Sequence, residues 1–409
     1  DGRVRLEYPI GQEIFSTAGW ISSLRVNPDG DRVAIAECPM RGDNVAFIRI
    51  VHRDGQVEDL GLGGSWGVLW DRDGERLWSS RGNALQVHEP GREPRRVYEA
   101  PTGISPVDVD AEGRMLVITV VNRREMIGRA PGAPGETNIS WLDWSTPRGI
   151  SDDGRLALFE EGNYFDKGGY ALFARRLDGS PAVMLGNGSM IALSPDGQHM
   201  AVGRFLGEGR RAIEIMPIGA GQIRPVNSGE FTFTAATGAW IAGPGRWGRL
   251  VTGVTTADGR RTIARFDLDA DTAPVPLIGP DFALSTRRFA VAADGSRLVV
   301  SDADGGAAWF GLDGSGPHPV QGIAPDEEIL AFTADGSGLY VLASATLPAR
   351  ITIVDPDTGA RRPWREIAPL DPSGVFTVDR FYITPDGAGY VYSVRRAQSR
   401  LQIMEPIPR

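Results

Sequence analysis

The feature that most constrains the fold of this sequence is a short turn motif that ends in glycine and recurs along the whole chain. Two clear copies run from Asn27 to Gly30 and from Ser194 to Gly197, both with Pro-Asp-Gly as their last three residues. Proline presets the first central position of a type I turn, aspartate tolerates the second, and glycine takes the left-handed position that closes a hairpin. Each copy therefore predicts a hairpin tip between two β-strands.

The motif marks nine units, whose marker glycines follow one another at intervals of 39 to 51 residues. The marker glycines are Gly30, Gly74, Gly113, Gly154, Gly197, Gly248, Gly295, Gly336 and Gly387. Such a spacing is close to the roughly 40 to 50 residues of one four-stranded propeller blade. The sequence predicts an all-β chain in which residues 1–409 form a single β-propeller domain. Nine blades are expected, and eight blades with one unit as an insertion are the alternative.

Strand patterns flank the hairpin tips. Apolar or alternating segments precede and follow the first marker, from Ile21 to Val26 and from Arg32 to Ala36. The run from Met115 to Val121 is apolar on both faces, as a sheet between two neighbouring sheets requires. No long segment has a helical period, so stacked sheets are the expected architecture.

The ends of the sequence suggest how the ring closes. After the last marker there is room for two strands, about Gly389 to Val394 and Arg400 to Met404. The N-terminal region 1–16 is β-rich from Arg3 to Ser16 and precedes the first inner strand. We expect this region to supply the missing strand of the last blade, which would remove exposed sheet edges.

Composition excludes several classes of partner. The chain has 43 Lys+Arg against 52 Asp+Glu, a formal net charge of -9, so binding to nucleic acid is not expected. Its longest apolar run, Met115 to Val121, is far shorter than the roughly 20 residues of a membrane span. The single cysteine, Cys38, excludes an internal disulfide or a cysteine metal cluster. Because the chain begins at Asp1 without a methionine, we interpret it as part of a longer protein, and any tether to a membrane would lie in a missing N-terminal segment.

Motifs of known chemistry lack the context that their chemistry needs. The segment from Gly63 to Gly67 matches G-x-S-x-G, but no helix follows and no histidine is placed as its base. The segment from Gly243 to Gly248 matches G-x-G-x-x-G without a βαβ unit. The four histidines are far apart, and no cofactor or metal site is predicted. The aspartates from Asp267 to Asp271 favour a turn, with a structural cation as the alternative.

Several blocks resemble a known family. Trp-Leu-Asp-Trp from Trp141 to Trp144, the segment from Leu6 to Gly11, and Leu177 to Val183 carry the resemblance, together with the repeat itself. The repeat resembles the Tol-type propellers of bacterial periplasmic proteins. The blocks are similar to the C-terminal extracytoplasmic propeller of bacterial transmembrane serine/threonine protein kinases.

The resemblance implies a non-catalytic sensor domain, periplasmic or at the cell surface, that binds a small ligand or a protein for a membrane signalling kinase. The kinase itself is absent, since no H-R-D catalytic segment occurs in this chain. A free-standing periplasmic scaffold of the Tol type is one alternative. A propeller hydrolase, lyase or lactonase is another, and it would need a convergent catalytic cluster that the linear sequence does not show.

The binding surface is expected on the face where loops enter the inner strands and join the second strand to the third. Arginine and tryptophan would supply charge and aromatic contact there, and carboxylates would orient a polar partner. The alternative is that these side chains are solvated or brace adjacent blades. The candidate residues are Trp20, Arg41, Asp43, Arg123, Trp144, Glu160, Glu161 and Arg395.

Overall fold

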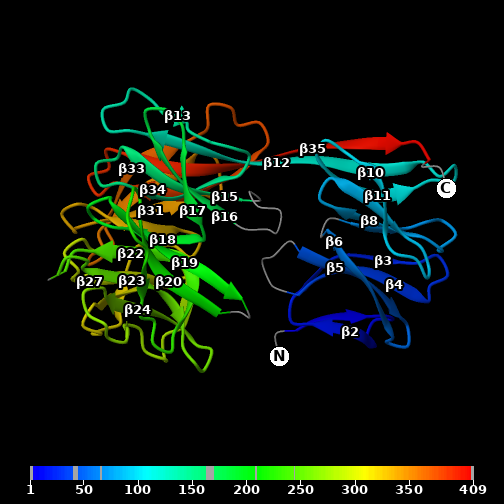
Figure 1. Ribbon diagram of the computed structural model, residues 1–409, viewed down its shortest axis with the longest axis horizontal. Helices are drawn as coiled ribbons and strands as arrows, with labels where there is room; N and C mark the ends of the chain where they lie inside the picture. Colours follow the sequence, from blue (N-terminus) through cyan, green and yellow to red (C-terminus); the bar gives the residue numbers. More distant parts are fainter. Residues whose placement is uncertain are drawn as a thin grey trace. The chain divides into compact units, whose positions relative to one another are not determined.

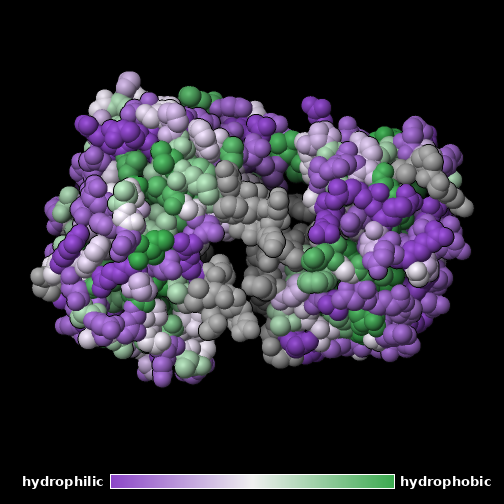
Figure 2. All heavy atoms as spheres, in the orientation of Figure 1, coloured by the Kyte–Doolittle hydropathy of each residue, from purple (hydrophilic) through white to green (hydrophobic). Residues whose placement is uncertain are grey.

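The computed structural model describes residues 3–39, 45–64, 67–162, 170–207, 210–243 and 245–406. Regular structure in these ranges is β-strand throughout, which confirms the all-β prediction (Figure 1). The same ranges contain no helix with the length and apolarity that crossing a membrane requires. The face drawn in Figure 2 is mainly hydrophilic, with scattered hydrophobic side chains.

The hairpin prediction is confirmed in detail. All nine marker glycines have a positive φ, between 66° and 80°, the region that favours glycine. At the first marker, the Gly30 N–H donates to the Asn27 carbonyl at 3.0 Å, and the Asp29 side chain accepts from the Asp31 N–H. The same glycine-to-carbonyl bond recurs at every marker except Gly248, whose N–H donates instead to Asp269. Asp269 therefore stabilises a turn.

The chain forms two compact units. Unit 1 contains residues 1–122 and 397–409, and unit 2 contains residues 123–396. The division falls inside two long strands, β12 (Met115–Arg129) and β35 (Tyr390–Met404), so each strand gives its two halves to different units. The sequence predicted one ring over the whole chain. In the structure β12 and β35 lie in one sheet with β11, β13 and β34, and the division between the two units crosses this sheet.

Unit 1 has three stacked sheets and a two-stranded ribbon, with β7 contacting β3 and β11. The ribbon consists of β1 (Val4–Glu7) and β2 (Glu13–Thr17). The first sheet is β3 (Trp20–Val26), β4 (Arg32–Cys38), β5 (Val45–His52) and β6 (Val57–Gly64). The second is β7 (Val68–Trp70), β8 (Leu77–Arg81), β9 (Ala84–His88) and β10 (Arg95–Glu99). The third joins β11 (Gly103–Val109) to the first half of β12 and the second half of β35.

Unit 2 is a closed ring of six four-stranded sheets within the described residues. Five are formed by consecutive strands, and their first strands are β14 (Ser145–Ile150), β18 (Ser189–Leu193), β22 (Thr232–Ile241), β26 (Leu284–Val291) and β30 (Glu328–Phe332). Their second strands are β15 (Leu156–Gly162), β19 (His199–Gly207), β23 (Arg249–Thr255), β27 (Arg297–Asp302) and β31 (Leu339–Ala343). Their third strands are β16 (Tyr170–Arg176), β20 (Arg210–Pro217), β24 (Arg261–Asp267), β28 (Ala307–Gly311) and β32 (Ala349–Val354). Their fourth strands are β17 (Val183–Asn187), β21 (Arg224–Val226), β25 (Val275–Pro276), β29 (His318–Val320) and β33 (Arg361–Ile367).

The sixth sheet closes the ring. It joins β34 (Val375–Ile383) and the first half of β35 to the second half of β12 and to β13 (Thr137–Asn138). The first strands contact one another in the order β34, β14, β18, β22, β26, β30 and back to β34. This circular order of stacked sheets is that of a β-propeller.

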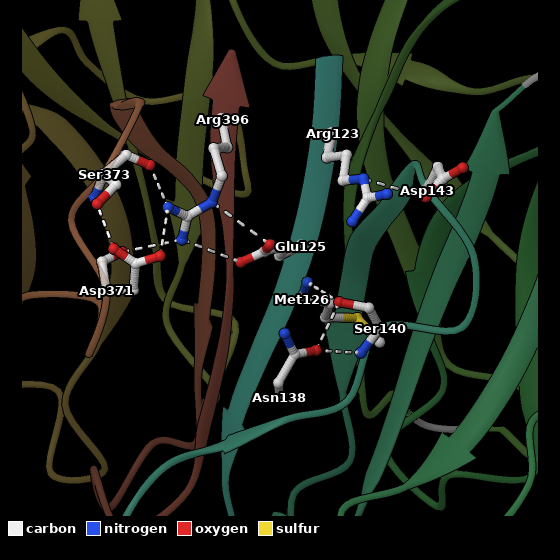
Figure 3. A network of polar contacts seen from close by, with 9 residues as sticks. All are labelled: Arg123, Glu125, Met126, Asn138, Ser140, Asp143, Asp371, Ser373 and Arg396. Atoms are coloured by element: carbon white, nitrogen blue, oxygen red, sulfur yellow. Dashed lines mark hydrogen bonds and ion pairs between the residues drawn. The ribbon is translucent and has the colours of Figure 1, made fainter. Parts of the chain in front are cut away.

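Closure by the N-terminal region was predicted, and the structure corrects that prediction. β1 pairs with β2, while the last sheet is completed by β12 and β13 from the middle of the chain. Arg396 on β35 fixes this pairing, since its guanidinium lies 3.4 Å from Glu125 on β12 and also binds Asp371 and the Ser373 carbonyl (Figure 3).

The core lies between adjacent sheets. On one side of the closing sheet, Met126 and Val391 pack with Phe159 and Phe173 of the next sheet. Tyr390 and Tyr392 both donate from their hydroxyls to Glu136 at 2.8 Å, which joins β35 to the segment between β12 and β13. In unit 2 the closing sheet thus packs on both faces. The run from Met115 to Val121, predicted to be buried on both faces, differs: Met115 and Val117 are buried, and the other residues of the run are half-buried.

Candidate ligand-binding site

Five of the eight predicted site residues lie in unit 2 and cluster where β14 begins. They are Arg123, Trp144, Glu160, Glu161 and Arg395. Trp20 lies in unit 1, and Arg41 and Asp43 fall outside the described residues. The five residues lie near the entry to β14 and β34 and at the far end of β15, and that this face binds a ligand stays a prediction.

Trp144 is held by a buried carboxylate. The Glu161 side chain has no solvent exposure, and it accepts hydrogen bonds from the Leu142 N–H at 3.0 Å and the Trp144 N–H at 3.2 Å. The Ser145 hydroxyl donates to the same carboxylate. Burial raises the pKa of Glu161, against these hydrogen bonds, which lower it.

The indole of Trp144 packs directly on a glycine. A Cβ atom at Gly162 would lie only 2.6 Å from Trp144 Cδ1, so a larger residue there would push the ring away. The start of the same loop is fixed by Ser140, whose hydroxyl accepts from the Met126 N–H at 2.8 Å (Figure 3). The loop and the ring are therefore positioned from both ends.

Arg395 lies between two aromatic rings. Its guanidinium carbon is 5.6 Å from the centroid of Trp144 and 4.8 Å from that of Phe376. The Nε atom of Arg395 is buried and has no hydrogen-bond partner, and no carboxylate in the described ranges forms an ion pair with this side chain. Phe376 remains 53% exposed, so one side of the stack is open to solvent.

Arg124 lies on the same tryptophan and was missed by the sequence analysis. It is 5.3 Å from the Trp144 centroid, donates to Thr146 at 3.2 Å and forms an ion pair with Asp379 at 2.7 Å. Burial lowers its pKa to about 10; Asp379 opposes this shift, while neighbouring arginines, Arg380 and Arg395 among them, add to it. Positive charge is thus concentrated here, in a protein that is acidic as a whole.

Arg123, which the sequence analysis selected, is directed elsewhere. Its side chain is 55% exposed and lies 3.5 Å from the exposed Asp143 (Figure 3). Adjacent residues of a strand point to opposite faces. Which of Arg123 and Arg124 faces Trp144 therefore depends on which residues of β12 point to that face of the sheet. The sequence pattern around these two arginines does not show this.

Glu160 is a structural residue, and this corrects its predicted role. The side chain is fully buried, forms a 2.6 Å ion pair with Arg148 and accepts from the Met190 N–H at 2.9 Å. Glu161 is equally enclosed by the Trp144 loop. The sequence analysis expected both carboxylates to orient a polar partner, but their burial directs them to the protein itself.

A backbone irregularity lies beside the cluster. Arg380 has a φ of 54°, unusual for a residue other than glycine, and the pairing of β34 with β35 shifts between Asp379 and Tyr382. Such bulges are common next to functional sites.

In the described ranges, no three His, Cys, Asp or Glu side chains are grouped so that they could hold an ion. Ser65 and Trp66 of the G-x-S-x-G segment lie outside the described residues. We use the term Arg395 site below for Arg395, Trp144, Phe376, Arg124 and Asp379.

The sheets thus define the class of protein, a β-propeller. No family model and no curated protein matches the chain. Among solved structures, a prolyl endopeptidase has 16% identity and a TM-score of 0.40, covering 91% of this chain. The chain spans only 54% of that enzyme's length.

Two further solved structures match more than two thirds of this chain. TolB from Acinetobacter baumannii has 11% identity and a TM-score of 0.41, covering 82% of this chain and 80% of its own. Oligogalacturonate lyase from Vibrio parahaemolyticus has 12% identity and a TM-score of 0.41, covering 70% of this chain and 76% of its own. At such scores these similarities carry no argument about function.

Proposed function

We propose that this chain is a binding module and that unit 2 binds an anionic ligand at the Arg395 site. One observation carries the proposal: Arg395 stacks between Trp144 and Phe376 with no carboxylate partner among the described residues, while a second arginine, Arg124, lies on the same tryptophan. A stacked guanidinium keeps its in-plane N–H donors available, which suits recognition of a carboxylate or phosphate.

The family resemblance adds a cellular role to this proposal. The module would act outside the cytoplasm as the sensor of a membrane serine/threonine kinase. The sequence of the gene that encodes this chain tests this role. A kinase domain and one apolar span would support it, whereas a signal peptide alone would favour the free-standing periplasmic scaffold.

Isothermal titration calorimetry tests the binding. The probes are benzoate, inorganic phosphate and an acidic hexapeptide, each titrated into the whole chain. We expect saturable binding of at least one probe, lost in Arg395→Ala and kept in Arg350→Ala. Arg350 is a matched control because it is an exposed arginine of the same unit, and its ion-pair partner among the described residues is the exposed Glu366. If no probe binds, or if Arg395→Ala binds as the unaltered chain does, the proposal is wrong.

A further inference from the structure

The charges of the Arg395 site specify how much negative charge a ligand should bring. Arg124 is paired with Asp379 at 2.7 Å, and the nearby Arg148 is paired with Glu160 at 2.6 Å. Each of these arginines is thus matched by one carboxylate. Arg395 lacks such a partner within the described ranges, so one further carboxylate completes the pattern.

A phosphate group fits this arrangement less well. It carries close to two negative charges at neutral pH and is typically bound by several donors from more than one cationic group. Arg124 of this site already donates to Asp379 and Thr146, and the nearby Arg148 donates to Glu160. A single negative charge is the better match.

The surroundings favour a ligand larger than a free carboxylate. Exposed apolar side chains occur in the stack and in the Trp144 loop. Phe376, which lies on Arg395, is 53% exposed. Trp141 and Leu142, in the loop that carries Trp144, are 40% and 50% exposed, and the Trp141 ring lies 5.7 Å from the Arg175 guanidinium. Tyr170, 45% exposed, lies opposite Gly162 in the strand pairing, and Gly162 touches Trp144. Aromatic residues and arginine together are the composition of protein-binding hot spots.

We propose that the ligand of the Arg395 site is an acidic peptide segment of a protein partner, with a glutamate or aspartate carboxylate on Arg395 and neighbouring apolar side chains on Phe376 and the Trp141 to Trp144 loop. This inference rests on the proposed function, because it names the ligand class of the same site. Its basis is charge complementarity with Arg395, which has no carboxylate partner among the described residues, and the exposed Phe376 ring that lies on it.

The experiment compares two hexapeptides, acetylated and amidated so that side chains supply the only carboxylates. One contains two glutamates and two leucines, and its counterpart has glutamine in place of each glutamate. Binding to the whole chain is measured by calorimetry, with inorganic phosphate and acetate as separate titrants. We expect the glutamate peptide to bind at least tenfold more tightly than the glutamine peptide and than either small anion.

Variants assign the contacts. Arg395→Ala should weaken the glutamate peptide at least tenfold and remove its advantage over the glutamine peptide. Phe376→Ala should weaken both peptides by a similar factor, because it removes apolar contact and leaves the charge in place. Arg350→Ala should change neither, and unchanged thermal melting of each variant excludes a loss of fold.

The outcomes separate the two proposals. Equal binding of both peptides overturns the present inference. Binding of phosphate that depends on Arg395, without binding of the glutamate peptide, also overturns it and leaves anion binding intact. If no anionic probe binds in a manner that depends on Arg395, both proposals are wrong.

Discussion

His88 provides a prediction whose size follows from its environment. It lies on β9 in unit 1, is 4% exposed, and its Nε2 atom is 2.8 Å from the Ser79 hydroxyl. Its Nδ1 atom is buried without a hydrogen-bond partner. Burial lowers the pKa of His88 from 6.5 to about 4, because the charged imidazolium is poorly solvated there.

The sign and magnitude of the effect on stability follow from linkage. Since the folded pKa is below the unfolded one, the unfolded chain takes up a proton between pH 6.5 and pH 4 that the folded chain does not. The free energy of unfolding therefore falls as the pH falls through this window. At pH 5, about 1.5 units below the unfolded pKa, the loss is about 2 kcal/mol at 1.36 kcal/mol per unit.

Hydrogen exchange is the suitable assay, because a chain of two units need not unfold in one step. Mass spectrometry of peptides covering β8 and β9 gives the local opening free energy at pH 7 and pH 5. The His88→Gln variant is the control, since it keeps a neutral polar side chain but does not titrate.

Carboxylates titrate alike in both proteins, so they cancel from the comparison. We expect the unaltered chain to lose about 2 kcal/mol more than His88→Gln between the two pH values, roughly a 30-fold difference in the opening constant. Equal pH dependence in the two proteins would refute the reasoning, as would an NMR titration of His88 with a pKa near 6.5.

Three further predictions concern unit 2. Glu160→Gln should destabilise the β14 to β15 hairpin by about 3 to 5 kcal/mol, because it leaves Arg148 buried without its carboxylate. Adding Arg148→Met should recover much of the lost stability. Denaturant unfolding followed by hydrogen exchange measures the stability of both variants. Arg396→Ala should cost about 1 to 3 kcal/mol and raise exchange in β12 and β35 together, whereas an effect confined to β35 would contradict its role in closing the ring. Gly162→Ala should displace Trp144 and weaken binding of the glutamate peptide while the melting temperature changes little; unaltered binding would show that the ring position does not matter.

The repeat could be predicted from sequence because its chemistry is local. A glycine at the closing position of a hairpin reports a positive φ wherever the fold places it, and all nine markers have it. Even the irregular unit at Gly248 conforms, although its N–H donates to a carboxylate instead of a carbonyl. Such markers do not show which strand each strand pairs with, because the pairing depends on residues far apart in the chain.

The division into two units shows that limit in particular residues. The apolar pattern of β12 ends at Val121, and the polar sequence Asn-Arg-Arg-Glu that follows resembles a loop. The strand nevertheless continues to Arg129, because Arg124 is paired with Asp379 and Glu125 with Arg396, both on strands from the C-terminal end. Polar residues can extend a buried strand when distant residues satisfy them.

The same distant pairing explains why the candidate site was only partly found. Trp144 and Arg395 were selected because loops at the entry to inner strands gather on one face, and 251 residues of sequence separate them. Arg124 and Phe376 were missed because each has a neighbour of similar polarity on its strand, Arg123 and Val375. Only the observed pairing shows that Arg124 reaches Trp144 and that Phe376 reaches Arg395. The closing sheet brings Arg124, Phe376 and Arg395 together from three strands, so the contacts that close the ring also assemble the site. A substitution that loosens the pairing of β12 with β35 should therefore weaken ligand binding even where it touches no residue of the site.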